Sequence, residues 1–312
     1  MSVHSEIAFE AGVEAHLLAH GWVQGTASHY RRDLGLDTAV LFEFIGATQP
    51  QEWERLLGLH GGADRAQAAF AKRLASEIDS RGTIDVLRRG VDDLGVKIRL
   101  TFFRPAHELT PGLRSLYDAN RLVVTRQVHH SESNPADSVD LLLSLNGLPV
   151  ATAELKNEVT GQTVVDAKRQ YRKDRNPKDL LFAKRAVVHF AVDQDLVFLT
   201  TRLAGDATEF LPFNQGSGGA GRPGGKGNPP NPSGYRTAYL WERVWQRDAW
   251  LDLLHRFVHE SRPGKGGKKT TSARLIFPRY QQWDLVLRLA EHAATHGPGR
   301  NYLAQHLSLI HI

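Results

Sequence analysis

Apolar residues near the start of the chain recur with the period of an α-helix. Phe9, Val13 and Leu17 share one face of a helix predicted over residues 5–20, and Gly21 ends it. A single apolar stripe of this kind is typical of a helix that packs on a core. We therefore expect the chain to open with an amphipathic helix.

Helical spacing returns over residues 50–91, where the turn at Gly61-Gly62 separates two predicted helices. β-branched and aromatic residues then dominate residues 96–104 and 121–129, as strands require, and a short helix fits between these two stretches. The first part of the chain thus predicts helices followed by a sheet.

The strongest local pattern is a pair of apolar runs joined by Asn146-Gly147, in the segment SVDLLLSLNGLPVATAELKN. Asn-Gly tolerates the positive φ of tight hairpin turns, so the segment predicts a β-hairpin. A helix over residues 163–175 and one or two buried strands over residues 186–201 are predicted to follow. Strands and helices in this order indicate an α/β fold.

Beyond these strands, residues 214–234 contain eight glycines and four prolines and predict a flexible loop. Helical spacing returns over residues 241–258. The Gly- and Lys-rich residues 263–270 are expected to be a linker.

Composition narrows the possible chemistry. The chain has no cysteine, which excludes disulfides, thiolate zinc sites and a cysteine nucleophile, so oxygen or imidazole ligands must hold any metal. Two glutamates interrupt the first ten residues, and no apolar run approaches the roughly 20 residues of a membrane span. We expect a soluble cytoplasmic protein with no membrane segment. Its formal net charge of +5 favours polyanionic partners.

Three residues of the predicted hairpin could carry chemistry. Glu154 and Lys156 stand two apart, so both project from one face of a strand. A regular two-residue Asn-Gly loop would pair Asp140 with Ala153. A three-residue loop or a bulge would shift the register by one and place Asp140 opposite Glu154.

The shifted register would bring two carboxylates together. They repel each other unless a divalent cation such as Mg²⁺ lies between them, and a lysine beside them could orient or deprotonate a water. Such a site could hydrolyse a phosphodiester. In the alternative interpretation, Glu154 and Lys156 form an exposed cross-strand pair and Asp140 is an edge charge.

Several longer stretches of the sequence support the interpretation as a metal-dependent site. DLLLSLNGLPVATAELKN, DAKRQYRKDRNPKDLLF, VVHFAVD and FLPFNQG resemble the amino-terminal part of the R subunit of type I restriction enzymes. FIGATQPQEW, RQVHHS, TAYLWERVW and IFPRYQQWDLV are similar to that family in the same order, so the resemblance covers nearly the whole chain.

The resemblance implies an α/β fold of the PD-(D/E)XK nuclease type, with a mixed central sheet flanked by helices. Asp140 and Glu154 would hold Mg²⁺, and Lys156 would act on the water or the scissile phosphate. The implied activity is Mg²⁺-dependent endonuclease cleavage of double-stranded DNA. The implied partners are the methyltransferase (M) and specificity (S) subunits, and sequence recognition would belong to the specificity subunit.

The family also implies a glutamate from the first helix, and Glu10 is preferred to Glu6 and Glu14 because it lies eleven residues before Gly21. This chain departs from the family's Gln-x-x-x-Tyr pattern, because Tyr171 follows Gln170 directly. We expect Gln170 to keep its place near the site and Tyr171 to pack in the core. Four cations of the same helix are expected to contact phosphates: Lys168, Arg169, Arg172 and Lys173.

The last part of the chain resembles the start of the family's motor domain. Residues 1–262 would form the nuclease domain and residues 271–306 the beginning of the motor, with Gln282 resembling an adenine-contacting glutamine. No G-x-x-x-x-G-K-[ST] loop follows it, so ATP is expected only for the full-length family member. Residues 307–312, LSLIHI, match a translated transposon-derived sequencing adapter, and we expect a truncated product with a non-native tail.

Two other functions remain open at this point. The chain could be a catalytically inactive DNA-binding or subunit-docking module. It could also be a hydrolase that uses Asp140 and Glu154 as an acid/base pair on another substrate, such as a glycan. A zinc site on His16 and His20 has the helical spacing but no evident third ligand.

Overall fold

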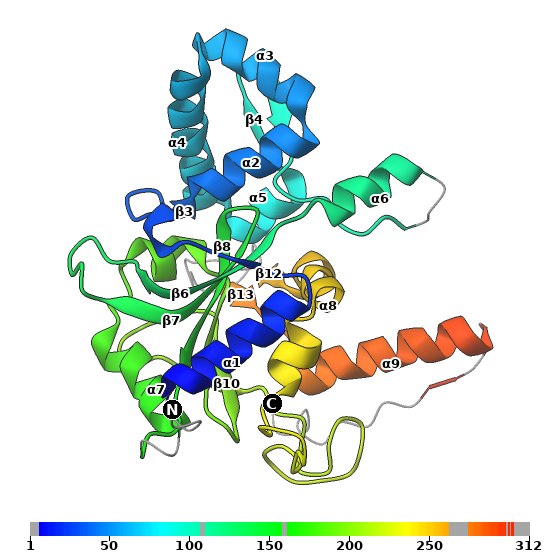
Figure 1. Cartoon of the computed structure of the whole chain (residues 1–312). Helices are drawn as coiled ribbons and strands as arrows, with labels where there is room; N and C mark the ends of the chain where they lie inside the picture. Colours follow the sequence, from blue (N-terminus) through cyan, green and yellow to red (C-terminus); the bar gives the residue numbers. More distant parts are fainter. Residues whose placement is uncertain are drawn as a thin grey trace, which may run out of the picture.

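The centre of the molecule is a seven-stranded mixed sheet with helices on both faces (Figure 1). The computed structural model describes residues 6–106, 110–157, 161–261, 274–297, 299 and 301–302. β1 pairs parallel with β6 and β8 pairs parallel with β9, whereas the other neighbours are antiparallel. Across the sheet the strands are β1 (Val23–Gln24), β6 (Leu122–His129), β7 (Ser138–Leu145), β8 (Leu148–Leu155), β9 (Val188–Val192), β10 (Val197–Thr200) and β11 (Leu211–Pro212). The predicted mixed α/β fold is confirmed.

The turn between β7 and β8 is the predicted Asn146-Gly147 pair, with φ of 51° and 85°. Asn146 is fully buried, and its side chain accepts from the Arg121 amide and donates to the Leu100 carbonyl. A side chain at Gly147 would lie 2.3 Å from the carbonyl oxygen of Asp37. Close packing on both sides therefore requires these two residue types.

A bulge sets the register of this hairpin. Leu143 pairs with Ala151 although the turn has only two residues, so Val150 is an extra residue in β8. The shift aligns Asp140 with Glu154 near the open end of the hairpin. Of the two predicted registers, the structure has the one that brings the carboxylates together.

Two hydrophobic cores lie on opposite faces of the sheet. α1 (Glu6–Ala19) covers one face and buries Phe9, Val13 and Leu17 in the larger core, as predicted. α7 (Val164–Arg169) and the π-helical turn that extends it (Gln170–Asp174) cover the other face. This helix begins at Thr163, whose hydroxyl accepts from the Val165 amide.

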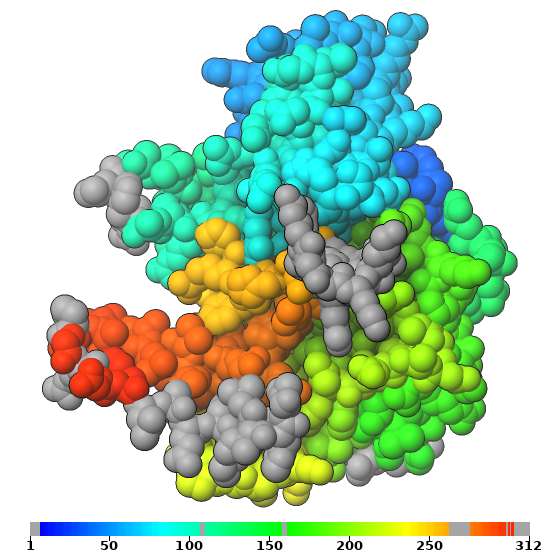
Figure 2. Space-filling model, turned by 180° about the vertical axis from the view of Figure 1, so that it is seen from behind, coloured from blue at the N-terminus to red at the C-terminus, as the bar shows by residue number. Residues whose placement is uncertain are grey.

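A helical unit stands beside the sheet at the top of Figure 1 and in blue to cyan in Figure 2. It includes the two helices predicted within residues 50–91, with a third after them. Its elements are α2 (Thr38–Thr48), α3 (Pro50–His60), α4 (Ala63–Arg81), α5 (Thr83–Arg89), and the hairpin of β4 (Val91–Asp93) and β5 (Val96–Ile98). The small hairpin of β2 (Tyr30–Arg31) and β3 (Leu36–Asp37) precedes α2.

The strand predicted over residues 96–104 was too long. Only Val96–Ile98 is a strand, and it pairs with β4 outside the central sheet. Side-chain amides satisfy the backbone that follows. Gln49 bonds both the amide and the carbonyl of Arg99, and Asn120 does the same for Phe102. α6 (Pro111–Asp118) is the short helix expected before β6.

The helix predicted over residues 241–258 is confirmed in part. It divides into a π-helical turn (Leu240–Val244) and α8 (Arg247–Asp252), which continues as a second π-helical turn (Leu253–Phe257). The break occurs because Gln246 has an extended backbone and caps α8 with its side chain. Residues 214–234 form neither helix nor strand, and the flexibility of this loop stays a prediction.

At the end of the described chain, β12 (His259–Ser261) pairs with β13 (Arg274–Ile276) and α9 (Tyr280–His296) follows. Phe277, Tyr280 and Trp283 pack into the larger core, whereas the far end of α9 projects from the body (Figures 1 and 2). The predicted linker at 263–270 and tail at 307–312 lie outside the described residues. Among the helices that the structure describes, none is long and apolar enough to cross a membrane.

Candidate active site

Three acidic side chains from three elements meet at the open end of the β7–β8 hairpin. Glu10 comes from α1, Asp140 from β7 and Glu154 from β8, and they are only 3%, 6% and 0% exposed. Burial raises the pKa of Glu10 and of Glu154, and the negative charge of Asp140 raises both further. Asp140 is therefore close enough to act on both glutamates, and these are the three acids that the sequence pattern and the resemblance indicated.

Lys156 lies in the same cluster. Its Nζ is 3.9 Å from Oδ2 of Asp140, and the side chain is almost fully buried. Oδ2 of Asp140 also accepts a 2.8 Å hydrogen bond from the amide of Leu155, which holds this carboxylate against β8. The same-face arrangement of Glu154 and Lys156 follows the predicted strand alternation, since Leu155 between them packs into the opposite core.

Arg175 fixes one side of Glu154. Its Nε donates to Oε1 of Glu154 over 2.8 Å, and its Nη2 donates to the Ser138 carbonyl. Oε2 of Glu154 is buried and has no hydrogen-bond partner among the described residues. Burial and Asp140 hold the pKa of Glu154 well above its usual range, while Arg175 and Lys156 oppose that shift.

Sequence reasoning did not place Arg175 in the site. The residue belongs to a run of basic residues and follows the end of the helix, so the sequence offered no reason to separate it from exposed cations. Its contact with Glu154 spans 21 residues and depends on how α7 ends.

Glu10 and Glu14 share Arg126 but differ in their other hydrogen-bond partners. Arg126 donates to Oε2 of Glu10 from Nε and Nη2, at 3.3 and 3.2 Å, and Gln127 donates to both oxygens of Glu10. Glu14, one turn later, accepts from Arg126 and from Gln24. Only Glu10 shares a partner with Asp140, because Gln127 also donates to Oδ1 of Asp140. The geometry thus favours Glu10, while the side chain of Glu6 lies outside the described part.

The donor set suits a hard divalent cation in part. Asp140 and Glu154 offer oxygen ligands only, and the unpartnered Oε2 of Glu154 is a buried acceptor that a cation would satisfy. Within the described ranges, however, no group of three or more acidic or histidine side chains is gathered closely enough to hold a metal ion. A two-carboxylate site on Asp140 and Glu154 fits the residues present.

Tyr171, on the helix that follows the hairpin, belongs to a second group of buried polar side chains. The hydroxyl of Tyr171 lies 2.8 Å from Oγ1 of Thr152, which lies 2.8 Å from Nδ1 of His189. Tyr171 is fully buried in the smaller core, as predicted, and burial lowers the pKa of His189 to about 3. Gln170 is half-buried, and its side chain makes no hydrogen bond to any described residue, so its predicted place near the site stays a prediction.

The four cations that are predicted to contact phosphates differ in their surroundings. Arg169 is exposed and forms no ion pair with the residues that the structure describes. The other three cations contact β10 or the segment that follows it: Lys168 lies 3.9 Å over the ring of Phe198 in β10, Arg172 donates to the Thr208 carbonyl, and Lys173 forms an ion pair with Asp206. Those three are already engaged within the protein.

Two other predicted positions lie apart from the cluster. Gln282, in the first turn of α9, is exposed and accepts from the Arg279 amide, so its side chain caps its own helix. His16 and His20 stack with their ring centroids 4.0 Å apart, but in the described chain no further ligand joins them to form a metal group.

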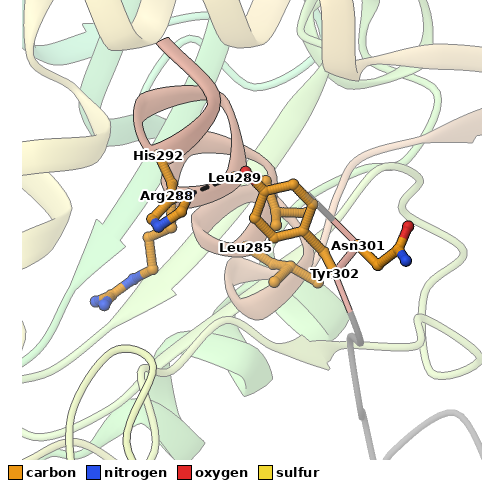
Figure 3. A pocket seen from close by; sticks show the side chains of 6 residues that line it. All are labelled: Leu285, Arg288, Leu289, His292, Asn301 and Tyr302. Carbon is orange, nitrogen blue, oxygen red and sulfur yellow. Dashed lines mark hydrogen bonds between the residues drawn. The ribbon is translucent and has the colours of Figure 1, made fainter. Parts of the chain in front are cut away.

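A hollow of about 380 Å³ lies on α9 (Figure 3). His292 bonds the hydroxyl of Tyr302 across it over 2.9 Å. The hollow shares no residue with the carboxylate cluster, so it is not part of the candidate site. Its lining consists of Leu285, Arg288, Leu289, His292, Asn301 and Tyr302.

Comparison with known proteins identifies a family for this chain. A family model described as the type I restriction enzyme R protein N terminus matches residues 49–208. The matched part is half of the chain and includes Asp140, Glu154 and Lys156, whereas Glu10 and Gln282 lie outside it. Among curated proteins, none matches the chain significantly.

Proposed function

Because the chain belongs to the family of type I restriction enzyme R protein N termini, we propose that it is the Mg²⁺-dependent endonuclease part of an R subunit. The observation that carries the proposal is the bulged hairpin, which aligns Asp140 with Glu154 and places Lys156 beside them. The substrate is double-stranded DNA.

Each residue of the cluster has a role that its contacts support. Asp140 and Glu154 would hold the cation, with Arg175 keeping Oε1 of Glu154 fixed so that Oε2 remains available. Bound there, Mg²⁺ would supply Lewis-acid stabilisation of the charge that develops on the scissile phosphate. Lys156 would orient the attacking water or the phosphate through its ammonium group. Glu10 would add negative charge from α1.

DNA would bind without sequence preference at this site. Exposed Arg169 is the cation of α7 that is best placed to contact a phosphate, since it forms no ion pair with a described residue. In this proposal the S subunit supplies sequence recognition, the M subunit is a further partner, and ATP-driven translocation belongs to the full-length protein.

The direct test is nicking of supercoiled plasmid by the purified chain in Mg²⁺. Asp140→Asn keeps an acceptor for the Leu155 amide and removes the charge, so its fold should survive. Lys156→Ala removes the ammonium, and Lys97→Ala changes an exposed lysine of β5 as a matched control. We expect cleavage by the parent and by Lys97→Ala only. Equal cleavage by Asp140→Asn would overturn the proposal.

An inactive DNA-binding module is the second candidate, and the pairing of Arg126 and Arg175 with two of the acids favours it. Circular dichroism and DNA binding in Ca²⁺ separate the two candidates. A folded parent that binds DNA but neither binds Mg²⁺ nor nicks plasmid would favour the module.

A further inference from the structure

Gln127 has an unusual backbone for its position. Its φ is 49°, in the left-handed region that disfavours residues other than glycine. The other described non-glycine residues with positive φ are Leu94 and Asn146, which lie in the turns β4–β5 and β7–β8. Gln127 instead lies within β6, and the pairing with β7 keeps one register across it. No inserted residue therefore explains the strained backbone.

The left-handed residue changes which side chains share a face. Consecutive side chains of a regular strand point to opposite faces. Here Arg126 and Gln127 both donate to Glu10. Val124 and Val128, which would share a face in a regular strand, belong to different cores. The strand thus changes face at Gln127, and this change aims its amide at the carboxylates.

The amide of Gln127 spans two elements. Its Nε2 lies 3.3 Å from both oxygens of Glu10 and 3.4 Å from Oδ1 of Asp140. Its Oε1 accepts a 3.0 Å hydrogen bond from Ser138, which fixes the orientation of the amide. One neutral donor therefore lies between the acid of α1 and the acid of β7.

We propose that Gln127 is a positioning residue: its amide holds the carboxylate of Asp140 for the cation site that Asp140 shares with Glu154, and ties Glu10 beside it. This inference rests on the proposed nuclease function. A neutral amide satisfies both carboxylates without cancelling their charge, whereas Arg126 cancels the charge of Glu10. Without the amide, Glu10 and Asp140 repel each other and Glu10 is left to Arg126. The strained backbone at Gln127 is maintained because it serves the site.

Gln127→Gly is the sharpest test, because glycine adopts the same backbone without strain and lacks the amide. Leu94→Gly is the matched control, since it relieves a left-handed residue in an exposed turn outside the site. The measurements are the Tm without metal and the Mg²⁺ dissociation constant by calorimetry. We expect both variants to fold and Leu94→Gly to keep or raise the Tm, whereas in Gln127→Gly the relief of backbone strain is offset by the loss of a donor to two buried carboxylates. Only Gln127→Gly should weaken Mg²⁺ binding, by about tenfold or more, as is usual for residues that orient metal ligands.

Gln127→Asn gives a second route. Asparagine tolerates a positive φ but is one methylene too short to reach both carboxylates, so it should weaken Mg²⁺ binding like glycine. In plasmid nicking, both variants should need more Mg²⁺ while recovering much of the parent rate at saturation. A purely structural role would lower the Tm and leave the Mg²⁺ requirement unchanged.

The outcomes separate the two proposals. If the parent binds Mg²⁺, Asp140→Asn does not, and Gln127→Gly binds it like the parent, the role of Gln127 is overturned and the nuclease site stands. If the parent binds no Mg²⁺ and nicks no DNA, the proposed function fails and the role of Gln127 fails with it.

Discussion

The two ends of the β7–β8 hairpin hold equally buried polar side chains in opposite states. At the turn, Asn146 donates to the Leu100 carbonyl and to Asn120, and accepts from the Arg121 amide. At the open end, Oε2 of Glu154 has no hydrogen-bond partner in the described structure, and the buried acid Asp140 lies close enough to raise the pKa of Glu154 beyond the effect of burial. Buried polar groups are normally satisfied, and this unpartnered carboxylate oxygen, with Asp140 and Lys156 nearby, is where the proposed cation would bind.

Under the proposed function, the turn serves folding and the open end serves chemistry. Substitutions at the turn should therefore cost stability and spare the chemistry, and substitutions at the open end should do the reverse.

The largest expected effect is on cleavage. Asp140→Asn and Lys156→Ala should each lower the rate of plasmid nicking by at least about 100-fold, because the first removes a charge that holds the cation and the second a charge that acts on the water or the phosphate. Urea denaturation should show that Asp140→Asn is as stable as the parent or more stable, since it relieves repulsion with Glu10 and Glu154. A large loss of stability with unchanged cleavage per folded molecule would reverse the comparison.

Next in size is the effect of Asn146→Ala on stability. It leaves the Leu100 carbonyl and the Arg121 amide without partners and puts alanine at a φ of 51°, so the free energy of unfolding should fall by roughly 2–4 kcal/mol. Asn146→Gly keeps the turn and loses only the hydrogen bonds, so it should cost less. Nicking by the folded fraction should not change in either variant.

A smaller effect is expected for DNA binding. Arg169→Ala should weaken binding a few-fold and reduce the slope of log K against log salt by about 1, as loss of one phosphate contact does. Lys173→Ala is the matched control, because its ammonium already pairs with Asp206. If the lysine variant changes the salt slope and the arginine variant does not, DNA follows a different path across α7.

The smallest effect is a change in how stability depends on pH. The pKa of Glu10 is raised by burial and by Asp140, so the folded protein binds this proton more tightly than the unfolded chain. Stability should therefore fall as pH rises from the ordinary glutamate pKa through the folded value. Glu10→Gln removes this loss, so urea denaturation should show a growing advantage over the parent as pH rises. Saturating Mg²⁺ should reduce the stability advantage of Glu10→Gln. If that advantage instead decreases as pH rises in metal-free buffer, the raised pKa of Glu10 is contradicted.

Periodicity and turn chemistry predicted much of this fold, because those signals are local. The helix with Phe9, the Asn146-Gly147 hairpin and the helix before Asn176 depend on neighbours in sequence. The register of the hairpin stayed open, since the bulge at Val150 depends on packing against both adjacent strands.

Sequence spacing predicted residues of the candidate site only where side chains alternate between the two faces of a strand. Glu154 and Lys156 follow from their spacing, and Asp140 from the choice between two registers. Gln127 and Arg175 could not be found this way. Gln127 acts through a left-handed backbone and a contact with a residue 117 positions away, and Arg175 through the way its helix ends.

The most direct test of the cation site is a crystal of the parent chain soaked in Mn²⁺ and examined for anomalous scattering. We predict a peak bounded by Oε2 of Glu154 and the carboxylate of Asp140, with no peak at the same place in Asp140→Asn. A parent crystal without that peak, from a preparation that nicks plasmid in Mn²⁺, would contradict the assignment of the site.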